Sequence, residues 1–92
     1  MWRYQAVYRK IGVGDSERIE YSICEVYLND LGELEGITES PSMTPFGESF
    51  LELIGDLEMM LADALKWKAV DFDNMHVGML FEPVDRKQEI NE

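Results

Sequence analysis

Residues 45–66 read P-F-G-E-S-F-L-E-L-I-G-D-L-E-M-M-L-A-D-A-L-K, and the rest of the chain is organised around this stretch. Apolar side chains recur within it at steps of three and four residues, which is the spacing of one face of an α-helix. The members of this apolar stripe are Phe50, Leu53, Ile54, Leu57, Leu61, Ala64 and Leu65. The acidic side chains of the stretch fall mostly away from the stripe; they are Glu52, Asp56, Glu58 and Asp63. The pattern predicts an amphipathic helix over residues 50–66 that packs on one face of a sheet.

The start of this helix carries a capping signature. Ser49 precedes the apolar run, and Glu52 follows three residues later. In a capping box the serine hydroxyl accepts from the backbone N–H at the third helical position, and the glutamate carboxylate accepts from the N–H of the cap. This structural role accounts for Ser49 without nucleophilic catalysis. Gly55 inside the helix costs about 1 kcal/mol relative to alanine, and it is either simply tolerated or marks a close approach to the sheet.

The first thirty-eight residues show the two-residue alternation of β-strands. Aromatic and aliphatic side chains alternate with others over residues 2–10, and a second alternating segment covers residues 18–28. Glycines at residues 12–14 supply the turn between these two segments. A second turn at residues 29–32 leads into a shorter strand over residues 33–38. The sequence therefore predicts a three-stranded antiparallel meander.

The segment after the helix is less regular. It leaves open whether residues 67–82 form one strand or two, the candidates being residues 67–70 and 75–81. Residues 84–92 are charged and polar, which is typical of a disordered acidic tail. We predict a single α+β domain over residues 1–83. Its three- to four-stranded, mainly antiparallel sheet follows the order β-β-β-α-β, with one long helix packed on one face.

Charge and cysteine content narrow the classes of function. The 92 residues carry a formal net charge of −11, which repels phosphate backbones and disfavours direct binding to nucleic acid. The charge has two interpretations, solvation of the surface and attraction of a basic partner. The single cysteine, Cys24, forms no internal disulfide, and its acidic neighbours disfavour a reactive thiolate. Because the sequence shows neither a leader nor a membrane-spanning run, we expect a cytoplasmic protein.

Side chains that carry catalysis or metal binding are few and show no specific pattern. His76 is the one histidine, and it follows Asp71 and Asp73. A metal site needs three or four converging ligands, which this motif does not supply. The many carboxylates form no distinctive pair, and a chain this short offers little cleft for glycoside chemistry. We therefore predict no enzyme activity, no metal and no cofactor.

Two residue types point to packing or contact surfaces instead. The methionines are numerous for this length, and we expect them to fill gaps in the core, the alternative being an adaptable binding surface. Four tyrosines lie in the first two predicted strands: Tyr4, Tyr8, Tyr21 and Tyr27. Tyrosine joins a large apolar body to a polar tip, so these side chains either form an interface stripe or pack under the helix.

The order of elements and the entry into the helix resemble the HicB-like antitoxin domain. Residues 22–28 stand where that family has its second strand, and Gly47-Glu48-Ser49 resembles its glycine-x-threonine segment. Residues 50–65 resemble the helix that follows. The chain departs from the family at residues 29–32, which replace a proline- and glycine-rich turn, and it lacks the DNA-binding module that often follows the domain.

This resemblance implies a partial ribonuclease-H-like fold without catalytic carboxylates. It also implies binding to a small basic toxin that cleaves mRNA, and it does not imply DNA binding by this chain. The leading hypothesis is a non-enzymatic protein-interaction domain that neutralises such a toxin, with the net charge steering the encounter. The alternative is a small homo-oligomeric structural or regulatory protein that pairs through an exposed strand edge.

Overall fold

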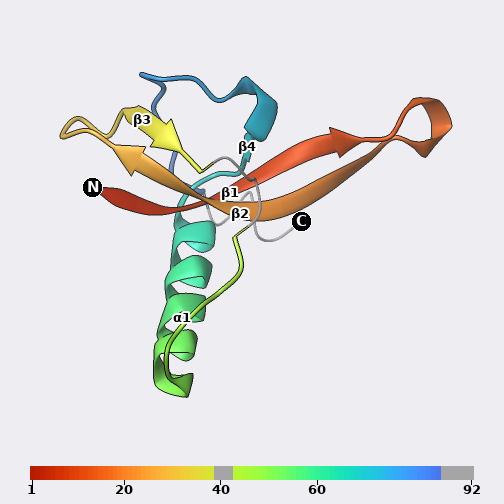
Figure 1. Ribbon diagram of the computed structural model, residues 1–92. Coiled ribbons are helices and arrows are strands. Elements are labelled where there is room, and N and C mark those ends of the chain that lie inside the picture. The colour runs from red at the N-terminus through yellow and green to blue at the C-terminus, as the bar shows by residue number, and fades with distance from the viewer. Residues whose placement is uncertain (39–42, 86–92) are drawn as a thin grey trace.

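The computed structural model describes residues 1–38 and 43–85. Within these residues the chain forms one α-helix and one four-stranded sheet (Figure 1). The strands are β1 (Trp2–Ile11), β2 (Arg18–Leu28), β3 (Leu34–Ile37) and β4 (Val70–Asp71), and the helix is α1 (Phe50–Lys66). Single turns of 3₁₀-helix, Gly14–Ser16 and Phe72–Asn74, precede β2 and follow β4. The predicted α+β class, the element order β-β-β-α-β and the helix bounds are confirmed.

The sheet is mixed rather than purely antiparallel. Its strand order is β3-β2-β1-β4, in which β1 pairs antiparallel with β2 and β2 pairs antiparallel with β3. The short strand β4 pairs parallel with β1, with Val70 opposite Val7 and Asp71 opposite Tyr8. A parallel neighbour needs a crossover connection, which α1 and the residues around it provide. The predicted three- to four-stranded, mainly antiparallel sheet is thus confirmed, and the strand after the helix is short and pairs in parallel at the edge.

Strands β1 and β2 form a long hairpin whose far end projects away from the rest of the sheet (Figure 1). The register runs from Trp2 opposite Tyr27 to Ile11 opposite Arg18. Residues 12–21 of this end are all exposed. Gly12 has a φ of +88°, and a Cβ there would lie 2.6 Å from a backbone oxygen in the same loop, so this turn requires glycine.

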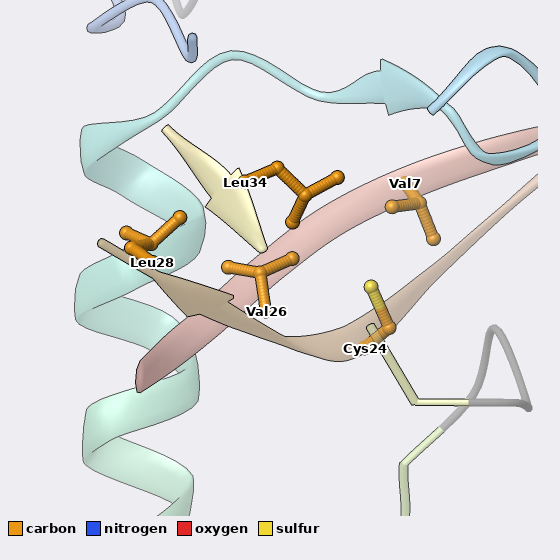
Figure 2. Packing of buried hydrophobic residues seen from close by; sticks show 5 residues of the cluster. All are labelled: Val7, Cys24, Val26, Leu28 and Leu34. Carbon is orange, nitrogen blue, oxygen red and sulfur yellow. The ribbon is translucent and has the colours of Figure 1, made fainter. Parts of the chain in front are cut away.

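The core lies on one face of the sheet and is closed by the segment that follows the helix. Its buried residues are Val7, Cys24, Val26, Leu28 and Leu34 (Figure 2). The partly buried side chains packed against them are Ile37, Val70, Phe72, Met75, Met79 and Phe81. Most of this cover therefore comes from β4 and the irregular chain after it. Two of the methionines pack against the core, as expected for residues that fill gaps.

The structure settles the open question about residues 67–82. Only β4 is a strand there, and it overlaps the candidate over residues 67–70 at Val70 alone. The candidate strand over residues 75–81 is absent. Gly78 has a φ of +92°, which is incompatible with a continuous extended backbone. The segment nevertheless follows the edge of β3, because Leu34 N–H donates to Met79 O at 2.9 Å and Gly78 N–H donates to Leu34 O at 2.8 Å.

The end of the described chain returns to the C-terminal end of α1. Pro83 forms an isolated bridge with Trp67, and the N–H of Val84 donates to Lys66 O at 2.8 Å. Residues 86–92 of the predicted disordered tail lie outside the described residues. Within residues 1–38 and 43–85, no helix has both the length and the apolar content needed to cross a bilayer.

Candidate interaction surface

The acidic side of α1 faces β1. Asp63 Oδ2 accepts from the backbone N–H of Tyr4 at 3.0 Å. One oxygen of Asp56 accepts from the Tyr4 hydroxyl, and the other accepts from the N–H of Phe46 at 2.8 Å. Because the two carboxylates are seven residues apart, about two helical turns, they lie on the same side of the helix. Hydrogen bonds to charged acceptors, which are stronger than neutral ones, therefore attach α1 to the sheet.

Tyr4 is the strand residue on which this attachment centres. Its side chain is 4% exposed, and its ring meets the ring of Trp2 edge to face at 5.3 Å between centroids. Burial, followed by the hydrogen bond to Asp56, raises the pKa of the Tyr4 hydroxyl well above its ordinary value. The hydroxyl consequently stays protonated and remains a donor to the carboxylate into the alkaline range.

The cap of α1 fixes where the helix begins. Ser49 Oγ accepts from the N–H of Glu52 at 3.2 Å. The carboxylate of Glu52 accepts from the N–H of Glu48 at 3.3 Å, one residue before the position that a capping box requires. Gly47 lies against the first turn of the helix, where a Cβ would come within 2.3 Å of Leu53 N. The loop therefore needs glycine at this point to enter the helix.

The side of α1 that carries Asp56 and Asp63 is attached to β1, and much of the apolar stripe of the helix is exposed. Met60 is the one buried residue of the helix, and Leu53 and Ala64 are partly buried. Of the exposed large apolar side chains of the helix, Met59 lies near Tyr4 and Asp56. The other six are called the α1 apolar face: Phe50, Leu51, Ile54, Leu57, Leu61 and Leu65. The exposed fraction is 75% for Phe50 and 61% for Leu61. Most of the predicted apolar stripe is therefore free rather than packed on the sheet.

The α1 apolar face is large for a domain of this size. Taking about 200 Å², the area of a large aromatic side chain, as an upper bound for each member, the six side chains present at most roughly 650 Å². The largest apolar patch on a typical monomer is about 300–600 Å², and a standard interface buries about 800 Å² on each partner. The face is thus large enough to supply most of one side of a protein interface.

The four tyrosines of the predicted interface share the face of the sheet opposite the core. The register places Tyr8 opposite Tyr21, and alternation puts Tyr4 and Tyr27 on the same side, away from Val7. Tyr4 is buried against α1, and Tyr8 is partly buried. Tyr21 and Tyr27 are exposed. An interface role for the exposed tyrosines stays a prediction.

The two side chains of potential reactivity, Cys24 and His76, lie in different surroundings. Cys24 is fully buried in the core, and this burial raises the pKa of its thiol to about 11. His76 is exposed, and its Nδ1 lies 3.2 Å from Asn74 O. Across residues 1–38 and 43–85, no three histidine, cysteine, aspartate or glutamate side chains are grouped so as to hold a metal ion.

Comparison of this chain with protein-family models, with curated proteins and with solved structures found no match. Its function must therefore be argued from its own surface. The attachment through Asp56 and Asp63 is what sequence reasoning missed, since both residues were expected to lie away from the packed side of the helix. Their spacing of seven residues is the signal that they act together.

Proposed function

We propose that this chain is a non-enzymatic protein-interaction domain that binds a basic protein through the α1 apolar face. The observation that carries this proposal is the orientation of α1. Asp56 and Asp63 hold the helix at β1, and six large apolar side chains are left facing solvent. A helix that presents a free apolar face is suited to insertion into a hydrophobic groove of another protein.

The charge of the chain selects the kind of partner. A net charge of −11 attracts a basic protein over distances beyond direct contact and speeds the encounter. Glu52 and Glu58 are exposed on α1 itself, so negative charge accompanies the apolar face. A partner with an apolar groove bordered by lysine and arginine side chains would match both features.

In its specific form, the proposal is an antitoxin-like protein that neutralises a small basic mRNA-cleaving toxin in the cytoplasm. The element order and the Gly47-Glu48-Ser49 entry into α1 support this form, because the resemblance to HicB-like antitoxins rests on them. A toxin that cleaves mRNA needs a positively charged surface to hold the phosphate backbone. An acidic domain competes with the RNA for that positively charged surface. The α1 apolar face adds apolar contact, which charge alone does not supply.

Capture from native cells tests the proposal. The tagged chain is isolated at low salt, and bound proteins are eluted by raising the salt concentration. The expected result is a small basic protein that elutes when the salt concentration is raised. When expressed alone, that protein should stop growth and degrade mRNA, and co-expression of the acidic chain should restore growth. An acidic partner would contradict the proposed role of the charge. So would a partner that stays bound equally well at low and high salt concentration.

Paired variants locate the docking surface. Phe50→Gln/Leu61→Gln replaces two members of the α1 apolar face, and we expect it to weaken capture by about tenfold or more, since anchor residues each contribute upwards of about 1 kcal/mol. The matched control Val13→Gln/Val77→Gln replaces two side chains that are similarly exposed elsewhere, at 82% and 74%. Equal capture by both variants would show that the partner binds at another surface.

The size of the α1 apolar face also supports a second candidate, a homodimer in which two copies pair through α1. Roughly 650 Å² approaches the area that one subunit buries in a standard interface. The net charge of −11 on each copy opposes this pairing. Sedimentation of the purified chain separates the candidates: a monomer at all concentrations favours the basic partner. A dimer that dissociates in the Phe50→Gln/Leu61→Gln variant would favour the homodimer over the basic partner.

A further inference from the structure

A cavity of about 350 Å³ lies at the C-terminal end of α1, on the side of the helix that faces β1. Its walls are mainly apolar and include Met1, Leu28, Leu31, Trp67, Leu80 and Phe81. Three charged residues also line it: Arg3, Asp63 and Lys66. A volume of this size is at the lower end of small-molecule sites. The cavity thus joins an apolar interior to two cationic side chains and one carboxylate, an excess of positive charge in a chain that is otherwise strongly acidic.

Arg3 is held in this cavity by its neighbours. Its Cζ lies 4.4 Å from the ring centre of Trp67 and 4.8 Å from that of Phe81, within the range of cation–π contacts. Nη1 donates to Tyr4 O at 2.8 Å and to Gln5 Oε1 at 2.7 Å. These contacts fix the guanidinium group, so its position does not depend on a ligand.

The charge of Arg3 is incompletely compensated. Its Nε is buried and has no hydrogen-bond partner among the described residues. The ion pairs in the described part of the chain are made by other cations, and one oxygen of Asp63 is already taken by the N–H of Tyr4. Burial lowers the pKa of Arg3, and the nearby charge of Asp63 partly opposes this shift. An anion in the cavity would supply the missing counter-charge.

We propose that this cavity binds a small organic acid, a carboxylate attached to an apolar or aromatic body. The carboxylate lies beside Arg3 and Lys66, and the body lies against the apolar walls. Because Nη1 of Arg3 already donates to Tyr4 O and Gln5 Oε1, Nη2 is the terminal nitrogen left to donate to the carboxylate, and a lysine ammonium adds a point charge at the rim. The apolar walls select against inorganic anions, which would lose hydration without replacement contacts. The cavity is separate from the α1 apolar face, so the site is independent of the proposed function.

An NMR titration of the isotope-labelled full chain tests this site with phenylpropionate, and with phenylpropanol as the uncharged control. We expect phenylpropionate to shift the indole N–H of Trp67 and the amide of Arg3 with saturation. Phenylpropanol should bind about tenfold more weakly or worse, because a charge-assisted contact is lost. A peptide ending in a phenylalanine carboxylate, compared with its amide, distinguishes a chain terminus from a free acid as the source of the carboxylate.

Charge-removing variants complete the test. Arg3→Met should abolish the preference for the acid over the alcohol, and Lys66→Met should weaken binding of the acid severalfold. Lys10→Met, on the projecting hairpin, removes the same charge far from the cavity and should leave binding unchanged. If Arg3→Met fails to fold, the site is still tested by Lys66→Met and by the comparison of phenylpropionate with phenylpropanol. Equal binding of acid and alcohol, or shifts centred on Trp2 instead of Trp67, would overturn the assignment.

Discussion

Replacing Asp56 with alanine tests how α1 is attached to the sheet. Asp56 accepts from the Tyr4 hydroxyl and from the N–H of Phe46. The variant leaves the hydroxyl of Tyr4, whose side chain is 4% exposed, without its acceptor. An unsatisfied buried donor costs about 1–3 kcal/mol, whereas the exposed Phe46 N–H can donate a hydrogen bond to water instead. We therefore expect a loss of about 2–3 kcal/mol, out of the roughly 5–14 kcal/mol typical for a chain of this length.

Urea unfolding followed by tryptophan fluorescence and by circular dichroism measures this loss. Glu58→Ala is the matched control, since it removes the same charge from an exposed position on the same helix and should change stability by at most about 0.5 kcal/mol. In a Tyr4→Phe background, Asp56→Ala should cost less than in the wild type, because the shared hydrogen bond is already gone. Equal effects of Asp56→Ala and Glu58→Ala would refute attachment through the acidic side.

Three further predictions concern single residues. Gly55→Ala should raise the stability by about 1 kcal/mol in a thermal unfolding experiment, because an added Cβ meets nothing within 4 Å; a loss would mean that the helix packs closely there. Ser49→Ala should cost about 1 kcal/mol in a denaturant titration, and no change would place the helix start elsewhere. Cys24 should react with a thiol reagent only as fast as the core opens, and rapid labelling would contradict its burial. Because burial raises the pKa of Cys24 from 9.0 to about 11, its stabilising contribution is complete below pH 9.0 and disappears as the pH rises through about 11.

The elements of this fold were predictable where their signals are local. Ser49 and the spacing of the apolar stripe set the bounds of α1, and both lie within the helix or next to it. The alternation in β1 and β2 encodes their pairing, since a two-residue period places one set of side chains on each face. The predicted turn at residues 29–32 joins β2 to β3, and Gly32 adopts a left-handed conformation within it.

The side of α1 that packs could not be predicted in the same way. An amphipathic pattern shows which side of a helix is apolar, but not whether the same chain covers that side. The decisive contacts join Asp63 and Asp56 to Tyr4, which is more than fifty residues away in the sequence. Similarly, most of the cover of the core comes from residues 70–81, where the pattern suggested a strand over residues 75–81 that the chain does not form. Both features depend on long-range geometry.

We infer that the α1 apolar face is free in the isolated chain and available to a partner. The most direct test is the free energy of unfolding of Phe50→Gln/Leu61→Gln, measured in urea at low and high protein concentration. We expect a change of at most about 0.5 kcal/mol per site and no dependence on concentration, as for exposed positions. A loss of about 2 kcal/mol or more per site, typical of buried side chains, would show that the chain or a second copy already covers this face.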